Sequence, residues 1–451
     1  MAKLKTKFVC QNCGASYPKW SGKCENCGQW NTLLEEFEDI PSGKNAIAKS
    51  AGRGKKLTTQ NLNEIISEKK QTRISSGIAD LDTVLGGGIL PAGVLLIAGQ
   101  PGIGKSTLLM QISGFIAGQK NVLYVSGEES AEQVAMRAKR LGASDAPNLK
   151  FASSTSADDI ASTIDGGDFD LIIVDSIQTL AMAEISSAPG SVSQITNSSN
   201  LIIQAAKKSG TAVILVGHIT KEGSIAGPKT LEHMVDVVLN FEGDRYGGFK
   251  VVRAVKNRYG STSEAAIFEM SENGLQIVEN PSAALLAERQ NTDGSIILAT
   301  LEGTRPILVE IQALVSSSNF GYPKRAASGF DLNRLNLLVA VLQRRTKLDL
   351  SDKDIHVNVV GGLKLDDRAA DLAVAMAIAS AAAGRKLSDG VVVFGEIGLG
   401  GEIRTVQQFE RRIAEAKKLG FNEIITPPTA SKSKFVRPVK NLRDALIQYL
   451  Q

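Results

Sequence analysis

The stretch Gly99-Gln-Pro-Gly-Ile-Gly-Lys105-Ser106-Thr107 decides how the rest of this sequence is interpreted. It matches the pattern G-x-x-x-x-G-K-[ST] of phosphate-binding P-loops. The apolar run Val94–Ala98 precedes it, and the helix-prone segment Thr107–Ile116 follows it. A strand, a glycine-rich loop and a helix in this order direct backbone N–H groups and the positive end of a helix toward phosphate. The stretch therefore predicts an ATP site.

The other parts of a nucleotide site can be assigned around this loop. Lys105 would reach the β- and γ-phosphates, and the Ser106 hydroxyl would bind Mg²⁺. The usual second partner of Mg²⁺ is an acid that ends another buried strand, and Leu171-Ile-Ile-Val-Asp175 supplies one. The predicted nucleotide-binding residues are Gly99, Gln100, Pro101, Gly102, Ile103, Gly104, Lys105, Ser106, Thr107 and Asp175.

Hydrolysis also needs a group that activates water. The segment Val122-Leu-Tyr-Val-Ser-Gly-Glu128-Glu129 ends a predicted strand in two carboxylates, an arrangement that can orient and polarise an attacking water molecule. We choose Glu128 as the base. Alternatively, both acids only begin the helix after Ser130 as favourable N-terminal charges, a role that fits Glu129 better than Glu128.

Four cysteines predict a metal site near the start of the chain. Cys10-Gln-Asn-Cys13 and Cys24-Glu-Asn-Cys27 are two C-x-x-C turns, and together they offer a tetrahedral shell of four sulfurs that suits Zn²⁺. Gly14 and Gly28 allow the tight backbone after each pair. The alternative is a pair of disulfides or a redox motif. A closed four-cysteine shell makes the zinc structural, and a unit this small needs the metal because its own core is too small.

The 451 residues exceed what one hydrophobic core supports, so several domains are expected. We assign residues 1–30 to a zinc unit and the polar residues 31–70 to a linker. In residues 71–280, strand-like and helix-like segments alternate, which predicts a parallel sheet with helices on both faces. Residues 285–451 form a further α/β block. The strands predicted in residues 71–280 are Leu95–Ala98, Val122–Ser126, Leu171–Asp175 and Ala212–Gly217. The strands predicted in residues 285–451 are Ser295–Leu301, Ile307–Leu314 and Val391–Phe394, and the helices predicted there are Asp366–Ala383 and Phe409–Leu419.

Composition and the placement of apolar runs indicate which partners and which cellular compartment to expect. The net charge of +4 permits a nucleic-acid partner but does not argue for one. The start of the chain lacks the apolar region of a signal peptide, and the longest apolar run, Leu372–Ala383, is too short to span a bilayer and is better interpreted as a buried helix. All four cysteines lie between positions 10 and 27, unlike a secreted disulfide framework. We therefore expect a cytoplasmic protein with no membrane partner.

The combination of motifs goes beyond a generic P-loop. The zinc knuckle, Ser76-Gly-Ile-Ala-Asp-Leu-Asp82 leading to Gly86-Gly-Gly88, and the P-loop together resemble the bacterial RadA (Sms) family of RecA-related DNA-repair ATPases. The pentapeptide Lys256-Asn-Arg258-Tyr-Gly260 is similar to that family's Lys-Asn-Arg-Phe-Gly, with Tyr259 in place of phenylalanine. Gly217-His218-Ile-Thr-Lys221-Glu-Gly223 is similar to the family's loop after its fourth core strand. The resemblance covers essentially the whole chain.

The resemblance implies roles that the residues alone leave open. Glu128 would be the catalytic glutamate, and His218 a sensor between ATP and the DNA loop; by itself, His218 could equally be a strand-end hydrogen-bonding residue. Lys256 and Arg258 would contact the ATP of a neighbouring subunit, which implies a ring, expected to be a hexamer. Without the family, a lysine and an arginine two positions apart more often form a solvated face.

The implied activity is that of a DNA-dependent ATPase, a helicase-type motor that translocates on single-stranded DNA and promotes branch migration alongside the RecA recombinase. DNA would contact the loops at about 176–198 and 218–232, which are rich in Ser, Gly and Thr and suit contacts to phosphate. A rival interpretation is a DNA-binding module that switches with nucleotide but does not translocate.

The last block looks like the Lon protease domain in fold. Matching Arg368–Met376 to Lon's catalytic segment puts Asp371 at the place of the nucleophilic serine, and Glu410 falls near that of the catalytic lysine. A carboxylate can replace neither group, so we expect a scaffold and no protease, although an ATP-dependent protease is the rival function. Its basic residues form either a DNA-facing surface or scattered solvated charges: Arg305, Lys324, Arg325, Arg344, Arg345 and Lys347.

Overall fold

The computed structural model describes residues 5–30, 32–38, 72–218, 229–243, 248–318, 322–428 and 433–450. Two compact units are present: the first takes in residues 1–241 and 254–262, and the second takes in 242–253 and 263–451. Among the described residues, no helix is long and apolar enough to cross a membrane.

The four-cysteine unit is a small antiparallel sheet. Its strands β1 (Lys5–Cys10), β2 (Ser16–Tyr17) and β3 (Leu33–Glu38) lie in the order β2-β1-β3. Strand β3 pairs along the whole of β1, and Leu33 at its start is buried beside Cys10 and Cys24. The sheet therefore extends to Glu38, past the end at residue 30 that the sequence suggested, because this strand completes the small core around the cysteines.

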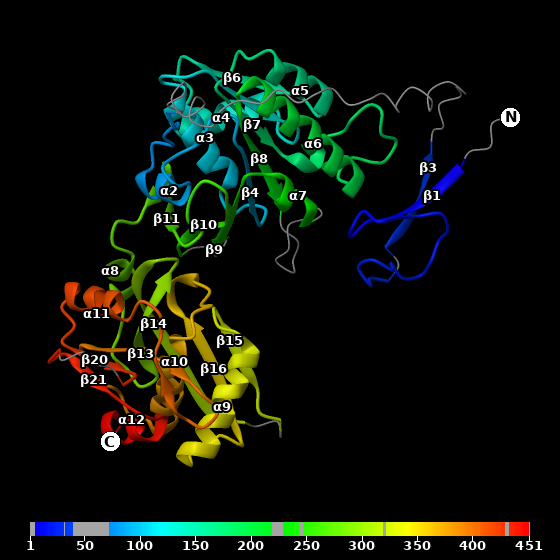
Figure 1. Cartoon of the computed structure of the whole chain (residues 1–451). Coiled ribbons are helices and arrows are strands. Elements are labelled where there is room, and N and C mark those ends of the chain that lie inside the picture. The colour runs from blue at the N-terminus through cyan, green and yellow to red at the C-terminus, as the bar shows by residue number, and fades with distance from the viewer. Residues whose placement is uncertain are drawn as a thin grey trace, which may run out of the picture. The chain divides into compact units, whose positions relative to one another are not determined.

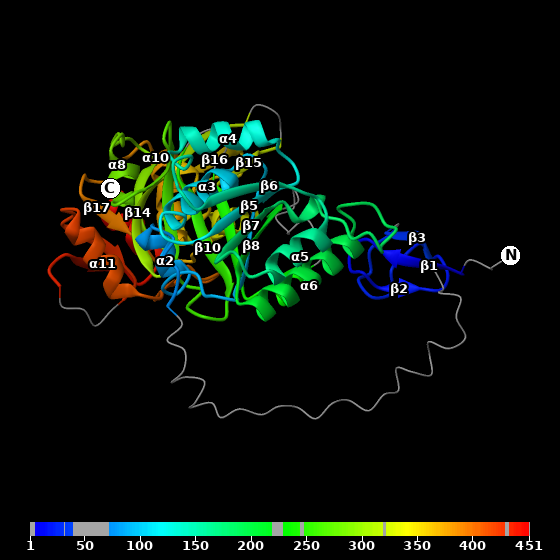
Figure 2. The same ribbon diagram turned by 90° about the horizontal axis from the view of Figure 1, so that it is seen from above.

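Six consecutive strands of the nine-stranded sheet that contains the P-loop strand run parallel, in the order β9-β4-β8-β7-β5-β6. Helices α3 and α4 lie on one face and α5 and α6 on the other (Figures 1 and 2), as the alternating pattern predicted. The central strands are buried on both faces, as a parallel sheet between helix layers requires. The elements are α2 (Ala79–Val84), β4 (Val94–Gly99), α3 (Lys105–Ile116), β5 (Val122–Ser126), α4 (Ala131–Arg140), β6 (Leu149–Ser153), α5 (Ala157–Asp165), β7 (Leu171–Asp175), the 3₁₀ turn η1 (Ile177–Thr179), α6 (Val192–Ser209), β8 (Ala212–His218), α7 (Lys229–Met234) and β9 (Val237–Gly243).

The strand order brings the motifs together. Strand β8 lies between the P-loop strand β4 and β7, so Gly99 pairs with His218, while Ser126 at the end of β5 pairs with Asp175 at the end of β7. The carboxyl ends of four strands therefore form one continuous edge, the place where open parallel sheets bind ligands.

Of the two loops expected to contact DNA, the first is described in full and the second only in part. The first, 176–198, includes the 3₁₀ turn η1 and ends inside helix α6, so its last seven residues are helical. Ser191 caps that helix by accepting the backbone N–H of Gln194, which the Ser/Gly-rich composition of the segment concealed. In the second loop, residues 219–228 lie outside the described residues.

The second unit is also α/β. Its main sheet has the order β15-β16-β14-β13-β17-β20-β21, and β18 pairs with β19 separately. Helix α10 is buried along its first eleven residues, confirming the predicted buried helix. The elements are β10 (Lys250–Asn257, of which the first four residues belong here), β11 (Ala265–Ser271), β12 (Gly274–Ile277), α8 (Pro281–Leu286), β13 (Ser295–Glu302), β14 (Arg305–Ser317), β15 (Arg325–Ser328), α9 (Leu332–Thr346), β16 (Lys353–Val359), η2 (Val360–Gly362), α10 (Ala370–Ala383), β17 (Val391–Val393), β18 (Glu396–Ile397), β19 (Ile403–Arg404), α11 (Phe409–Lys418), β20 (Glu423–Thr426), β21 (Val436–Pro438) and α12 (Leu442–Tyr449).

Two boundaries in this unit differ from the predicted ones. The unit begins earlier than residue 285, because Val251, Ile267 and Val278 pack into the same hydrophobic core as the later strands. Helix α10 begins at Ala370 and not at Asp366. The side chain of Asp367 accepts the backbone N–H of Ala369 at 3.0 Å, so the residues before Ala370 form a turn.

Candidate functional site

The P-loop follows β4 and leads directly into α3, as its sequence predicts. Gly102 and Gly104 have φ angles of +78° and +118°, a region that favours glycine. At Gly99 a side chain would meet the carbonyl oxygen of Phe241 at 2.7 Å. The backbone can therefore turn at this point only because the motif supplies glycine at these positions.

Lys105 is buried at the start of α3, with 4% of its surface exposed. Its ammonium donates to the carbonyl oxygens of Gly99 at 2.9 Å and Gln100 at 3.1 Å, and it lies 3.3 Å from Nδ1 of His218. Burial lowers the pKa of Lys105 to about 8, while the charges of Asp175 and Glu128 act in the opposite direction. A cation is thus held inside the loop, where phosphate charge would stabilise it.

This pKa predicts how ATP binding depends on pH. ATP phosphates favour the protonated lysine, whereas the free protein loses that proton as pH rises through about 8. The affinity for ATP should therefore fall roughly tenfold between about pH 7 and about pH 9. Titration with a fluorescent ATP analogue measures this. Lys105→Arg, whose guanidinium stays charged, is the control and should show a flatter profile; equal profiles for both proteins would argue against the assignment.

Asp175 ends β7 and is buried, with the neighbouring strand holding it in place. The Tyr124 hydroxyl on β5 donates to Oδ2 of Asp175 at 2.7 Å. Burial and the Asp175 charge raise the pKa of Tyr124, which keeps the hydroxyl protonated as a donor. The carboxylate is thereby fixed at the sheet edge, beside the loop that would hold Mg²⁺ through Ser106. Tyr124 occupies an ordinary apolar position in its strand, so the local sequence does not mark it as a residue of the site.

The two adjacent glutamates have different surroundings. Glu129 forms a bidentate pair with Arg137 of α4, with one contact at 2.5 Å. Glu128 instead accepts the Ser176 hydroxyl and lies 3.3 Å from Nε2 of His218. The hydrogen bond with His218 lowers the pKa of Glu128, more strongly than burial raises it. Glu129 therefore holds a helix in place, whereas Glu128 faces the edge where Lys105 and Asp175 meet.

Lys256 and Arg258 on and after β10 both have partners within their own chain. The Lys256 ammonium donates to three carbonyl oxygens, those of Glu232, His233 and Val235, at 2.8–3.1 Å, around the end of helix α7. Arg258 is half exposed and lies 3.1 Å from Oδ1 of the buried Asp236. Basic groups at a helix C-terminus are favourable, so these contacts also have a structural value.

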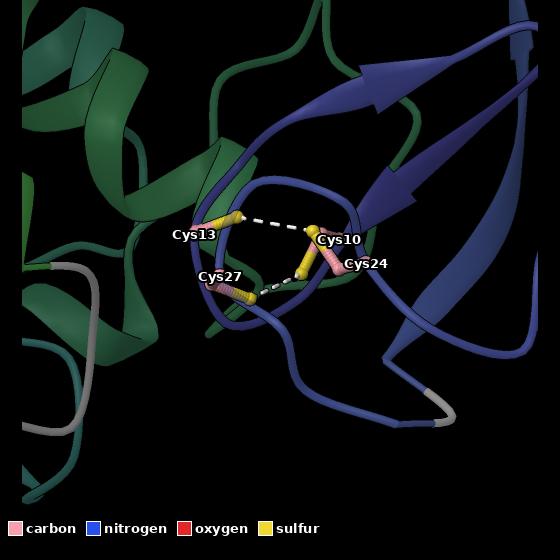
Figure 3. Close-up of side chains that lie close together, drawn as sticks. All are labelled: Cys10, Cys13, Cys24 and Cys27. Atoms are coloured by element: carbon pink, nitrogen blue, oxygen red, sulfur yellow. Dashed lines mark hydrogen bonds between the residues drawn. The ribbon is translucent and has the colours of Figure 1, made fainter.

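The four cysteines form a cluster that fits a metal ion (Figure 3). Their sulfur atoms all lie within 4.8 Å of one another, and the Cys10–Cys27 and Cys13–Cys24 pairs are 3.6 and 3.5 Å apart. A tetrahedral Zn²⁺ site requires sulfur separations of about 3.8 Å. All four thiols are free, and the described residues around them include the Thr32 and Tyr17 hydroxyls within hydrogen-bonding distance of sulfur. The geometry fits structural zinc.

Asp371 cannot serve as a nucleophile where the structure places it. It is 1% exposed and forms a bidentate pair with Arg334 of α9, and it also accepts the backbone N–H of Ile397 at 3.1 Å. Glu410 at the start of α11 is exposed. Asp371 is thus part of a buried ion pair that joins α9, α10 and β18.

Removing this pair should destabilise the second unit. Asp371→Ala leaves the half-buried Arg334 without its counter-charge, and the free energy of unfolding should fall by about 3–5 kcal/mol. Urea unfolding followed by circular dichroism measures the change, with exposed Glu410→Gln as the matched control. An unchanged midpoint for Asp371→Ala would show that the pair has no structural role.

The basic residues of this block do not behave as one group. Arg325 donates to the carbonyl oxygens of Lys324, Leu350 and Lys353, and Arg345 to that of Leu399. Arg344 and Lys347 are exposed near the end of α9. Part of the predicted surface is therefore engaged in holding the backbone, whereas Lys324, Arg344 and Lys347 lie exposed.

Three family models match separate parts of the chain. The family model described as an AAA domain matches residues 69–224, the rubredoxin metal binding domain matches 8–35, and the ChlI subunit of Mg-chelatase matches 336–430. A DNA repair protein RadA from Bacillus subtilis is 47% identical over 457 residues, covering 99% of both chains. One from Halalkalibacterium halodurans is 47% identical over 431 residues, covering 95% of this chain and 93% of its own. A crystal structure of the RadB recombinase covers 46% of this chain and all of its own, at 23% identity and a TM-score of 0.37.

Proposed function

Since this chain belongs to the RadA family of DNA repair proteins, we propose that it is a DNA-dependent ATPase of recombinational repair. It would bind single-stranded DNA, translocate along it and promote branch migration in the cytoplasm. The observation that carries the proposal is the convergence of Lys105, Asp175, Glu128 and His218 at one edge of a parallel sheet. These groups supply a phosphate-binding cation, a carboxylate for Mg²⁺ and a base, which are the parts that ATP hydrolysis requires.

In this proposal Glu128 activates the attacking water. Its low pKa keeps it ionised at neutral pH, so it can accept a hydrogen bond from water and orient it toward the γ-phosphate. Lys105 and the P-loop amides stabilise charge on the phosphates, and Mg²⁺ held by Ser106 and Asp175 would neutralise the rest.

His218 would connect nucleotide and DNA. It lies 3.3 Å from both the Lys105 ammonium and the Glu128 carboxylate, and it ends β8 and begins the second loop that we assign to DNA. A phosphate that draws Lys105 away from its present partners would change what His218 contacts. The contacts of His218 would then depend on the nucleotide.

We further propose that the ATP site is completed by a neighbouring subunit in a hexameric ring, with Lys256 and Arg258 as the contributed cations. The half-exposed Arg258 has only to exchange the carboxylate of Asp236 for phosphate. Branched DNA and the RecA recombinase are the proposed partners of the ring. A nucleotide-switched binding module has the same site but would not move along DNA.

Mixing two inactive variants tests the shared site. Arg258→Ala protomers keep an intact P-loop, and Lys105→Ala protomers keep intact cations, so mixed rings contain some complete sites and DNA-stimulated ATP turnover should partly return. The control is a mixture of Lys105→Ala and Glu128→Gln protomers. Both residues belong to the subunit that supplies the P-loop, so every site in the mixture is defective and no turnover should return. If the first mixture stays at the level of the single variants, Arg258 does not act across an interface.

A further inference from the structure

The zinc unit displays both tryptophans of the chain on its surface. Trp20 is 58% exposed and Trp30 is 68% exposed, and the sequence contains no other tryptophan. Tryptophan is usually well buried in folded proteins, since its ring is the largest apolar surface a side chain offers. Neither ring contributes to the core around the cysteines, which leaves both without a role in the functions described so far.

The two rings lie around one glycine. A side-chain carbon added at Gly22 would lie 3.6 Å from the ring of Trp30 and 3.8 Å from that of Trp20, so both indoles flank the same stretch of backbone. The ammonium of Lys23 lies 5.7 Å from the centre of the Trp30 ring, and Lys23 and Trp30 are bridged through their backbones. Lys19 and Lys23 are both exposed.

The metal site fixes this arrangement. Cys24, which follows Lys23 directly, is fully buried, and its backbone N–H donates to the carbonyl oxygen of Gln29, the residue before Trp30. Cys27 closes the turn between them, with the N–H of Gly28 donating to Cys24. A closed four-sulfur shell around zinc would therefore hold the two rings in position before any partner arrives.

The size and charge of the patch indicate its occupant. From the exposed fractions, the two indoles offer roughly 200–300 Å² together. A stable protein interface buries about 800 Å² on each partner, so this patch is too small to hold a protein by itself. It is large enough for one or two nucleobases, which stack on aromatic rings, and the adjacent lysines suit the phosphates that accompany each base.

We propose that Trp20 and Trp30 form a base-stacking surface for single-stranded DNA, with Lys19 and Lys23 contacting the backbone. This inference rests on the proposed function for the identity of the nucleic acid, and it adds a contact site outside the nucleotide-binding unit. Stacking on a ring face tolerates any base, so the surface would bind without sequence preference.

Tryptophan emission tests the proposal directly, because the signal of the full chain comes only from these two residues. Adding oligodeoxythymidylate at low salt should quench the emission, whereas an abasic oligonucleotide of equal length should not. In the absence of nucleotide, Trp30→Ala should bind a dye-labelled oligothymidylate about 10- to 100-fold more weakly by anisotropy. Trp30→Phe should retain most of the binding, and Glu25→Gln, an exposed change in the same unit, should have no effect.

The outcomes separate this proposal from the proposed function. Zinc content is measured for each variant, so a Trp30→Ala protein that keeps one zinc per chain reports on stacking and not on unfolding. If labelled DNA binds while tryptophan emission stays constant, the stacking surface is refuted and the DNA-dependent ATPase is not. Emission that changes with protein concentration and not with DNA would assign the rings to self-association and overturn the proposal. Absence of any DNA binding would overturn both.

Discussion

Lys105→Ala is expected to lower ATP turnover by about 10²–10³-fold or more, because the cation that neutralises the β- and γ-phosphates is lost. The buried position of Lys105 within the P-loop leaves little room for another residue to replace it. Phosphate release under saturating ATP and single-stranded DNA measures the effect.

The matched control for this change is Lys120→Ala. Lys120 is exposed beyond the end of α3 and pairs with Asp170 at the surface, so its loss should leave turnover unchanged. Retention of more than about a tenth of wild-type turnover by Lys105→Ala would end the assignment of the P-loop as the hydrolytic site.

Glu128→Gln is expected to bind ATP with normal affinity and to hydrolyse it about 10²–10⁴-fold more slowly, since only water activation is removed. The amide can still accept the Ser176 hydroxyl, so the local structure should persist. Single-turnover hydrolysis and nucleotide binding, measured on the same preparation, separate the two effects.

The neighbouring acid provides the control. Glu129→Gln breaks the bidentate pair with Arg137 and should lower the stability of α4, with turnover within a few-fold of wild type. If Glu129→Gln gives the slow-hydrolysis phenotype and Glu128→Gln does not, the base is Glu129.

Short sequence patterns predicted those elements whose structure depends mainly on neighbouring residues in the chain. The strands Val122–Ser126 and Leu171–Asp175 have the predicted bounds, because short β-rich runs between helical segments have few alternatives in a parallel sheet. The two C-x-x-C turns predicted the sulfur cluster, since each knuckle closes within a few residues. Glu128 was chosen over Glu129 from its position at the end of the predicted strand, and the family resemblance gives the same residue the catalytic role.

What the sequence did not reveal depends on contacts between distant positions. Tyr124 contacts Asp175 across 51 residues, and Arg334 pairs with Asp371 across 37. The end of the zinc unit was placed too early because β3 is defined only by pairing with β1. Nothing in the local sequence around Lys256 indicates that its ammonium would be occupied by the carbonyl groups at the end of α7.

In the proposed motor, ATP hydrolysis at this site moves DNA. The most direct measurement follows a three-stranded branched DNA intermediate with labelled strands, together with ATP turnover in the same reaction. We predict that single-stranded DNA stimulates turnover and that the branch point moves with ATP, but neither with a non-hydrolysable analogue nor with Glu128→Gln. The proposal would be contradicted if DNA did not change the rate of ATP turnover. It would also be contradicted if DNA binding depended on nucleotide while the branch point stayed in place.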